Sequence, residues 1–262
     1  MVDQKALIMN STRQNLLLLC LNEQDIFQTK STIGFKCDCS FLNWVIIGNN
    51  FDHADLVYAR KHYKNNPNCT LWIDAQNITA KNSLSCDAFT RSESLSEMTL
   101  DLKNLPSISC NSHIKIRRVT SDHEILATWV PLVDRCYCPE LNLSDIEKNS
   151  CDWNTFFNYL RTSTAYSQMN FFLGYWNEIP VSTGLFIVKD DAVYVYLIGT
   201  LSEYRQKGLG MAITNQPLNY FKENGIKKAF LFATTRGKSI YEKIGFTTIG
   251  QVDIYKAKTE GR

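Results

Sequence analysis

Long apolar runs and an excess of one charge are both missing from this chain of 262 residues. The longest apolar run near the start, residues 16–21, has six residues and is closed by Asn22 and Glu23. A secretory signal needs roughly 7–15 apolar residues and a membrane-spanning helix about 20, so neither is expected here. With 28 Lys and Arg against 26 Asp and Glu, the chain lacks the basic excess of a general nucleic-acid binder. We therefore expect no membrane and no nucleic-acid partner.

Metal-binding cysteine spacings are missing as well. The chain has nine cysteines and four histidines but no Cys-x-x-Cys pair, and its two Cys-x-Cys pairs are Cys37/Cys39 and Cys136/Cys138. A zinc site needs several converging ligands, usually with more than one residue between paired cysteines. Zinc therefore stays a minor alternative, and we expect no metal. Free thiols are typical of a reducing compartment, which predicts a cytoplasmic protein.

The hydrophobic pattern divides the chain at residues 104–112, a stretch of turn-forming and small residues. Beyond it, the pattern predicts strands at 113–119, 170–176, 181–188, 192–198, 229–233 and 246–255, and helices beginning at 120–124 and covering 152–165, 208–224 and 238–244. This order predicts an α/β fold with a mixed sheet. The runs 192–198 and 229–233 are apolar on both faces, which is typical of central strands that helices cover on both sides. We predict domains at 1–105 and 113–262.

A glycine-rich turn after one of these central strands is the segment that indicates chemistry. Gly208 and Gly210 lack Cβ atoms, so the backbone can bend and bring its N–H groups close to a bound anion. The start of the helix that follows favours phosphate oxygens, and Arg205 and Lys207 add positive charge beside it. These features predict a cradle for a pyrophosphate.

Two familiar phosphate motifs do not fit this turn. The P-loop requires a glycine, four spacer residues and then Gly-Lys followed by Ser or Thr, and this complete pattern is absent. The dinucleotide fingerprint requires a further glycine after Gly210, where this chain has Ile213.

The turn instead resembles the signature of the GNAT acyltransferase superfamily, Arg/Gln-x-x-Gly-x-Gly/Ala, which Arg205, Gly208 and Gly210 match. A second stretch, residues 239–246, resembles the Tyr-x-x-x-Gly-Phe ending of the family, with Tyr241 as its tyrosine. The resemblance covers about residues 114–258. It implies a GNAT-type mixed central sheet with helices on both faces.

The resemblance also implies a function: direct transfer of an acetyl group from acetyl-CoA, as cosubstrate, to an amine of a small molecule or peptide in a ternary complex. Backbone amides of the turn would hold the pyrophosphate, and the end of the preceding strand would pair with the pantetheine arm. The cosubstrate positions implied in this way are Leu197, Ile198, Gly199, Arg205, Gln206, Lys207, Gly208, Leu209, Gly210, Met211 and Thr235. Its partners would be acetyl-CoA and an amine acceptor, and the protein a monomer or a homodimer. The cysteines have no catalytic role in this interpretation.

Tyr241 is the implied catalytic residue, standing near the thioester sulfur and giving a proton to the departing thiolate. The base is less clear. The family's glutamate position, eleven residues before Arg205, holds Tyr194, and no Asp or Glu lies between Ala192 and Ser202. A water relay would then remove the proton of the amine, or the amine would bind already deprotonated. Glu203 at the loop edge is more simply a solvated carboxylate.

Three further departures from the family pattern affect this interpretation. Thr235 replaces an asparagine that often contacts CoA, and Ser202 replaces a proline. Pro217 falls inside the predicted helix 208–224, where proline costs about 3 kcal/mol, so we expect a kink or an interruption there. Aromatic residues around Trp153 and Tyr175 either line an acceptor pocket or pack in the core.

The first hundred residues contain no phosphate loop. Their pattern predicts strands at 41–48, 69–74 and 96–102 and a helix at 52–62. This arrangement looks like the degenerate half of two-domain GNAT proteins, so a tandem of a degenerate and an intact GNAT-like domain is expected; an unrelated α/β cap is the alternative. A non-catalytic acyl-CoA-binding sensor or interaction protein on the GNAT fold is the alternative to an enzyme.

Overall fold

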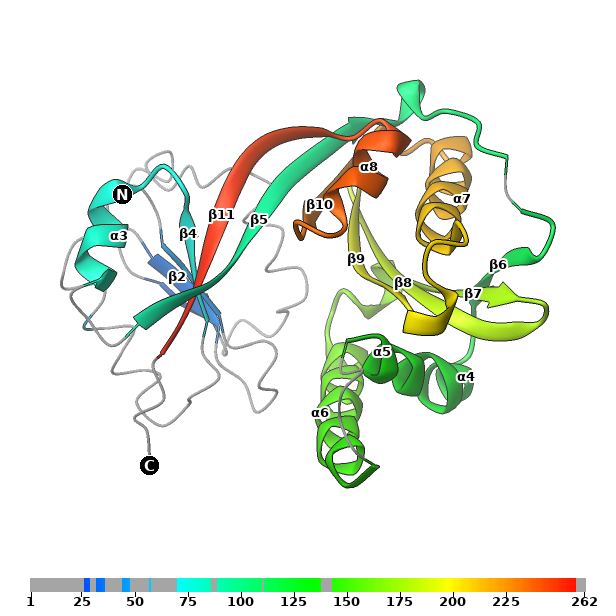
Figure 1. The fold of residues 1–262 in the computed structure, drawn as a ribbon, viewed down its shortest axis with the longest axis horizontal. Coiled ribbons are helices and arrows are strands. Elements are labelled where there is room, and N and C mark those ends of the chain that lie inside the picture. The colour runs from blue at the N-terminus through cyan, green and yellow to red at the C-terminus, as the bar shows by residue number, and fades with distance from the viewer. Residues whose placement is uncertain are drawn as a thin grey trace. The chain divides into compact units, whose positions relative to one another are not determined.

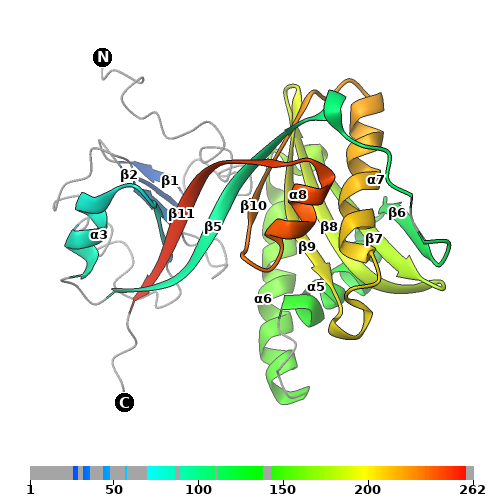
Figure 2. The same cartoon turned by 45° about the horizontal axis from the view of Figure 1, so that its top comes forward.

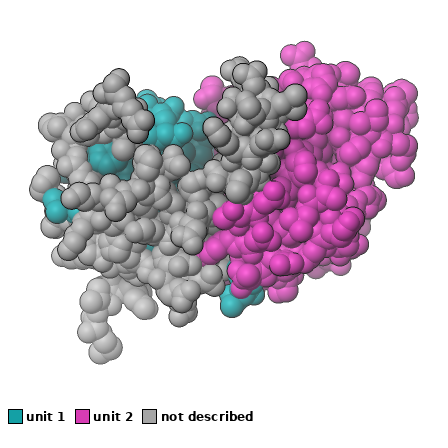
Figure 3. All heavy atoms as spheres, turned by 90° about the horizontal axis from the view of Figure 1, so that it is seen from below, with its two compact units in different colours: residues 1–97, 163–165, 249–262 teal, residues 98–162, 166–248 magenta. Residues whose placement is uncertain are grey.

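The computed structural model describes residues 26–28, 32–35, 44–47, 57, 70–85, 89–109, 111–137 and 143–257. The chain forms two compact units, coloured separately in Figure 3. Unit 1 comprises residues 1–97, 163–165 and 249–262, and unit 2 comprises 98–162 and 166–248. The run at 16–21 lies outside the described residues, as does the predicted helix 52–62 apart from Val57, which is helical. The domain boundaries predicted from the sequence stay a prediction.

Unit 2 is a mixed α/β structure (Figure 1). Its elements are the end of β5 (Phe89–Asp101), β6 (Ile114–Val119), α4 (Asp122–Glu124), α5 (Val130–Tyr137), α6 (Leu143–Thr162), β7 (Met169–Trp176), β8 (Ile179–Lys189), β9 (Ala192–Thr200), α7 (Leu209–Glu223), β10 (Lys228–Ala233), α8 (Lys238–Ile244) and the start of β11 (Thr247–Ala257). The strands lie in the order β5-β10-β9-β8-β7-β6. Neighbours from β6 to β9 are antiparallel, and β9 and β10 are parallel. The order of strands and helices predicted after residue 113 is confirmed.

Helices cover both faces of this sheet (Figure 2). Adjacent residues on a strand point to opposite faces, and two adjacent phenylalanines of β7 do so. Phe171 packs on Trp129, with ring centroids 5.0 Å apart, and Phe172 packs on Phe221 of α7 at 6.2 Å. The sheet of unit 2 is therefore packed on both of its faces.

Two element starts and the expectation at Pro217 differ from the structure. The helix predicted at 152–165 begins earlier, at Leu143. The strand predicted at 96–102 begins at Phe89, because pairing with β11 rather than an apolar pattern holds its polar first half; Ser92 Oγ donates to the Ile254 carbonyl at 3.1 Å. Of the two outcomes expected at Pro217, the interruption is wrong, since α7 continues through this buried residue; the kink stays a prediction.

Unit 1 is built around a smaller apolar cluster. Its described elements are β1 (Ile26–Gln28), β2 (Thr32–Phe35), β3 (Trp44–Ile47), β4 (Thr70–Asp74), α3 (Ile78–Ser85), the first part of β5 and the last part of β11. β3 and β4 are parallel, and β11 is antiparallel to β4. The cluster consists of Val45, Ile47, Leu71, Ile73, Ala80, Leu84 and Tyr255. The strands predicted at 41–48 and 69–74 are present as β3 and β4, whereas α3 was not foreseen.

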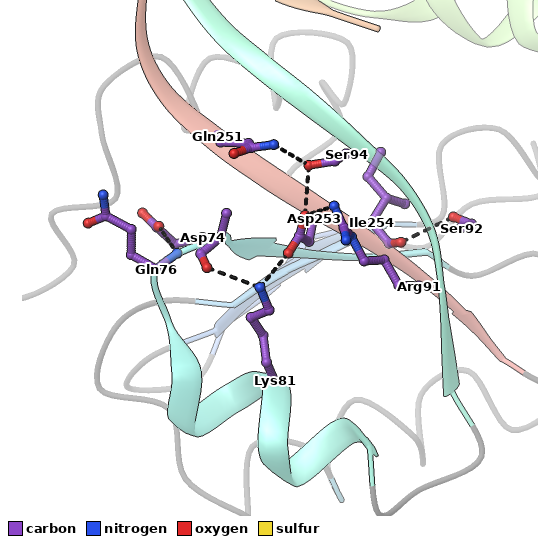
Figure 4. Close-up of polar contacts among 10 residues, drawn as sticks. Asp74, Gln76, Lys81, Arg91, Ser92, Ser94, Gln251, Asp253 and Ile254 are labelled. Carbon is purple, nitrogen blue, oxygen red and sulfur yellow. Dashed lines mark hydrogen bonds and ion pairs between the residues drawn. The ribbon is translucent and has the colours of Figure 1, made fainter. Parts of the chain in front are cut away.

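A buried carboxylate ties three elements of unit 1 together (Figure 4). Asp253 on β11 is 1% exposed. One of its oxygens lies 2.7 Å from Lys81 Nζ of α3, and the other accepts from Ser94 Oγ at 2.7 Å and lies 3.0 Å from Arg91 Nη2, both on β5. Burial by itself raises the pKa of this carboxyl, but the hydrogen bonds from Lys81 and Ser94 and the nearby positive charges lower it below its ordinary value.

We expect Asp253→Asn to lower the free energy of unfolding by about 3 kcal/mol, because it breaks a buried charged network. In the wild type, this carboxylate stabilises fully above its unfolded pKa of about 3.9 and stops stabilising as pH falls through the lower folded value. Stability below about pH 4 should therefore fall less steeply in the variant. Denaturant unfolding at several pH values measures both effects.

The matched control is Asp191→Asn, which removes an exposed ion pair with Lys227. It should change stability by less than about 1 kcal/mol. Equal losses in the two variants would contradict the role given to Asp253.

Candidate functional site

The sheet of unit 2 separates between its two parallel strands. β9 and β10 pair only from Ala192/Lys228 to Val195/Leu231. Beyond that point, the described residues show no pairing between residues 197–200 of β9 and β10. The backbone of β9 is therefore a central strand in its first half and an edge on this side in its second half.

A bulge in β9 marks the point of separation. The pairing with β8 changes register between Thr183 and Leu185, and Leu197 has a positive φ of 49°. A left-handed conformation costs a non-glycine residue about 1–2 kcal/mol. Two buried side chains of β8 hold this backbone: Thr183 Oγ1 donates to the Leu197 carbonyl at 3.1 Å, and Ser182 Oγ donates to the Gly199 carbonyl at 2.6 Å.

The chain then turns into α7 through a loop with free backbone donors. Arg205 Nε donates to the Thr200 carbonyl at 3.1 Å, which closes the turn. Gln206 and Gly208 have φ values of 62° and 89°, and helical bonding starts with Ala212 N donating to the Gly208 carbonyl at 3.0 Å. No side chain caps the start of α7, so the first-turn amides of this helix remain available to an anion.

Lys207 is held beside this loop by two aromatic rings. Its Nζ lies 5.2 Å from the ring centroid of Trp176 and 4.8 Å from that of Tyr204, both within cation–π range. Glu203 at the loop edge is exposed and lies 3.5 Å from Arg135 Nη2. Hydrogen bonds from its own backbone amide and from the Ser202 hydroxyl lower the pKa of the Glu203 carboxyl.

Tyr241 lies on α8, a short helix that ends at Gly245 in a left-handed conformation with φ 104°. The tyrosine is half-buried, and its ring meets that of Phe246 edge-on, with centroids 6.0 Å apart. Burial raises the pKa of the Tyr241 hydroxyl above its ordinary value, so the hydroxyl stays protonated at neutral pH. Thr235 is exposed in the connection between β10 and α8.

The helix α5 also reaches this part of β9, which the sequence did not indicate. Tyr137 Oη donates to the Ile198 carbonyl at 3.1 Å. A Cβ atom at Gly199 would lie 2.7 Å from Cys136 Cβ, so only glycine allows this approach. Burial raises the pKa of the Cys136 thiol to about 12, which leaves the thiol protonated. A residue 61 positions away in sequence gives no local signal of such a contact.

Acidic side chains are absent from the separated part of β9. Tyr194, at the position of the family's glutamate, is buried and stacks on Phe230 with centroids 5.4 Å apart. Among the described residues of unit 2, Asp134 on α5 is the one acidic side chain that is buried, and burial raises the pKa of its carboxyl. In the part of the chain that the structure describes, no three His, Cys, Asp or Glu side chains are placed to hold a metal ion. None of the described helices is long and apolar enough to cross a membrane.

The structure thus brings the predicted site residues together around one end of unit 2. Leu197, Ile198 and Gly199 lie on the separated half of β9, and residues 205–211 form the loop and first turn of α7. The α7 and α8 helices adjoin, since a Cβ at Gly210 would lie 3.3 Å from Ile240 Cδ1, the residue before Tyr241. Their roles toward a ligand stay predictions.

Comparisons with known proteins agree with this arrangement. The model of the acetyltransferase (GNAT) domain family matches residues 142–257. A GCN5-related N-acetyltransferase from Kribbella flavida superposes with a TM-score of 0.66 and 15% identity, over 97% of this chain and 96% of that one. A conserved protein of unknown function from Staphylococcus epidermidis superposes with a TM-score of 0.66 and 16% identity, over 92% and 96%.

A tandem GNAT protein from the clavulanic acid biosynthesis pathway superposes with a TM-score of 0.55 and 11% identity, over 98% of both chains. At these identities the likeness shows the fold alone. Curated protein sequences contain no match to this chain.

The contact between α5 and β9 can be tested by stability. Gly199→Ala should lower the free energy of unfolding by about 1–3 kcal/mol, because its Cβ would overlap Cys136. Cys136→Gly removes the atom that it strikes, so the double variant should lose less than the sum of the two single losses. Denaturant unfolding of the four proteins measures this coupling; strictly additive losses would contradict the contact.

Proposed function

We propose that this protein is an N-acetyltransferase that moves an acetyl group from acetyl-CoA directly to an amine of a small molecule or peptide. The match of the GNAT acetyltransferase domain model to residues 142–257 supports this proposal. The observation that carries the proposal is the separation of β9 from β10 immediately before an uncapped helix start. An extended thioester arm can pair with the free side of β9, while the diphosphate at its other end reaches the amides of α7.

In this proposal, the amides of residues 206–211 hold the pyrophosphate, and the left-handed Gly208 lets the backbone approach it closely. Arg205 holds the conformation of the loop through its hydrogen bond to the Thr200 carbonyl. Lys207 adds charge beside the loop from its place between Trp176 and Tyr204. Residues 197–199 pair with the pantetheine arm.

The transfer itself needs few groups from the protein. The neutral amine nitrogen attacks the thioester carbonyl carbon, the C–N bond forms, and the C–S bond breaks. Tyr241 then gives its hydroxyl proton to the thiolate sulfur, and the nitrogen loses a proton to water. Because burial raises the pKa of Tyr241, the tyrosinate left behind is a strong base. It takes a proton back from the water that received the amine proton, and the tyrosine ends the cycle neutral.

We further propose residues 113–262 as the acetyltransferase domain, residues 1–105 as a GNAT-like half without a CoA site, and a cytoplasmic location. Similarity to a tandem GNAT protein over 98% of this chain supports the two-domain proposal. The second candidate function is a non-catalytic acyl-CoA sensor. It is favoured by the lack of a carboxylate on β9, where Tyr194 is buried against Phe230.

Two glycines with the same backbone strain give a matched test of cosubstrate binding. Gly208 (φ 89°) and Gly225 (φ 88°) lie at opposite ends of α7, and neither would bring a Cβ closer than 3.7 Å to another residue. Both alanine variants should lose about 1–2 kcal/mol of stability. Only Gly208→Ala should weaken acetyl-CoA binding, by about tenfold (roughly 1.4 kcal/mol), because its Cβ faces the bound diphosphate.

Isothermal titration calorimetry with acetyl-CoA and thermal unfolding measure the two effects. An equal loss of affinity in both variants would show a general effect of strain and contradict the cradle. No binding by the wild type would overturn both candidate functions.

Tyr241→Phe separates the enzyme from the sensor. We expect release of free CoA thiol in the presence of an amine panel to fall about 100-fold, with acetyl-CoA affinity unchanged. The wild-type rate should rise with pH as the amine deprotonates. Because burial raises the pKa of Tyr241, ionisation of this tyrosine should cause no decline in rate at any pH up to about 10. Wild-type protein that binds acetyl-CoA and turns over with no amine would favour the sensor.

A further inference from the structure

Tyr137 reaches β9 on the side that β10 has left open. Successive carbonyls of a strand point to opposite neighbours. The Leu197 and Gly199 carbonyls both accept hydrogen bonds from β8 side chains. The Ile198 carbonyl between them accepts instead from the hydroxyl of Tyr137 on α5, at 3.1 Å.

The ring of Tyr137 is fixed in this position from two directions. Its neighbour Cys136 packs against Gly199 with no room for a Cβ, which sets the distance of α5 from β9. The Tyr137 ring also lies 6.0 Å from the ring of Trp153 on α6. Tyr137 is 46% exposed, so part of the residue faces open space.

The phenol of Tyr137 also lies within electrostatic reach of Tyr241. Burial raises the pKa of the Tyr137 hydroxyl, and the phenol of Tyr241 raises it further. The two tyrosines come from helices far apart in the sequence, α5 and α8. Both hydroxyls are neutral at physiological pH, so they can adjoin a thioester without adding charge.

We propose that Tyr137 is a specificity-determining residue that restricts the acyl donor to groups about as short as acetyl. This inference rests on the proposed function, in which the thioester sulfur lies beside Tyr241 and the arm pairs with β9. The arm runs back along residues 199–197 from the start of α7, and Tyr137 already bonds the Ile198 carbonyl there. The arm therefore uses the other backbone groups of this stretch, and an acyl chain that continues past the sulfur meets the ring of Tyr137. A two-carbon group ends before the ring, and a longer chain has to displace it.

The test is the affinity of the full chain for acetyl-CoA, butyryl-CoA and hexanoyl-CoA, measured by calorimetry. For the wild type, we expect hexanoyl-CoA to bind at least about tenfold more weakly than acetyl-CoA (roughly 1.4 kcal/mol). Tyr137→Ala should bring the two affinities within about threefold of each other. Tyr137→Phe keeps the ring and should keep the wild-type preference.

The control is Tyr220→Ala, a tyrosine of similar exposure (43%) on α7, which should leave the preference unchanged. Because the readout is a ratio of affinities, a general loss of stability does not mimic the effect. If Tyr137→Ala does not fold, Tyr137→Leu also shortens the side chain and should relax the preference in the same way.

The outcomes separate the two proposals. A wild type that binds none of the three thioesters overturns the proposed function and this inference with it. A wild type that binds acetyl-CoA, with the same chain-length preference in the Tyr137→Ala or Tyr137→Leu variant, overturns only the role of Tyr137.

Discussion

The strand β9 is a central strand at one end and an edge strand at the other. The change from pairing with both neighbours to pairing with β8 alone occurs near Leu197. Its left-handed conformation, with φ 49°, shifts the register against β8 and ends the pairing with β10. Such a conformation is unfavourable for leucine, so the surroundings must stabilise it. Buried hydroxyls of Ser182 and Thr183 do so by bonding carbonyls that a regular ladder would have paired differently.

The remainder of the site is arranged around this separation. The loop after β9 closes through Arg205, and α7 begins without a side-chain cap, so its amides remain free. From the other side, α5 approaches closely because residue 199 is glycine. The site therefore depends on local positive charge and backbone donors, in a protein whose total charges nearly cancel.

Unit 1 depends on a different kind of interaction. Its apolar cluster is small, and a charged network around Asp253 joins α3, β5 and β11 across it. Lys81 and Arg91 keep part of their surface in water, with side chains 30% and 51% exposed, while Asp253 is enclosed. A buried carboxylate of this kind specifies which residues pair, because any other register would leave its charge without partners.

The sequence by itself determined the elements whose signals are local. The alternation at 113–119 and the apolar runs at 192–198 and 229–233 predicted β6, β9 and β10. Gly225 and Gly245 marked the ends of α7 and α8, because both residues adopt the left-handed conformation that glycine favours. The glycine turn at 208–210 also predicted the left-handed turn that leads into α7; anion binding by this turn stays a prediction, which rests on the donors that any helix start supplies.

Only the tertiary structure decided what depends on distant residues. The polar first half of β5 is a strand because β11 pairs with it, and α7 runs through Pro217, which lies buried in the folded unit. The point where β9 leaves β10, and the approach of Tyr137 to Ile198 across 61 positions, have no periodicity to reveal them. Local propensity reports on residues within a few turns of each other, whereas these contacts arise from packing between elements that meet only once the chain has folded.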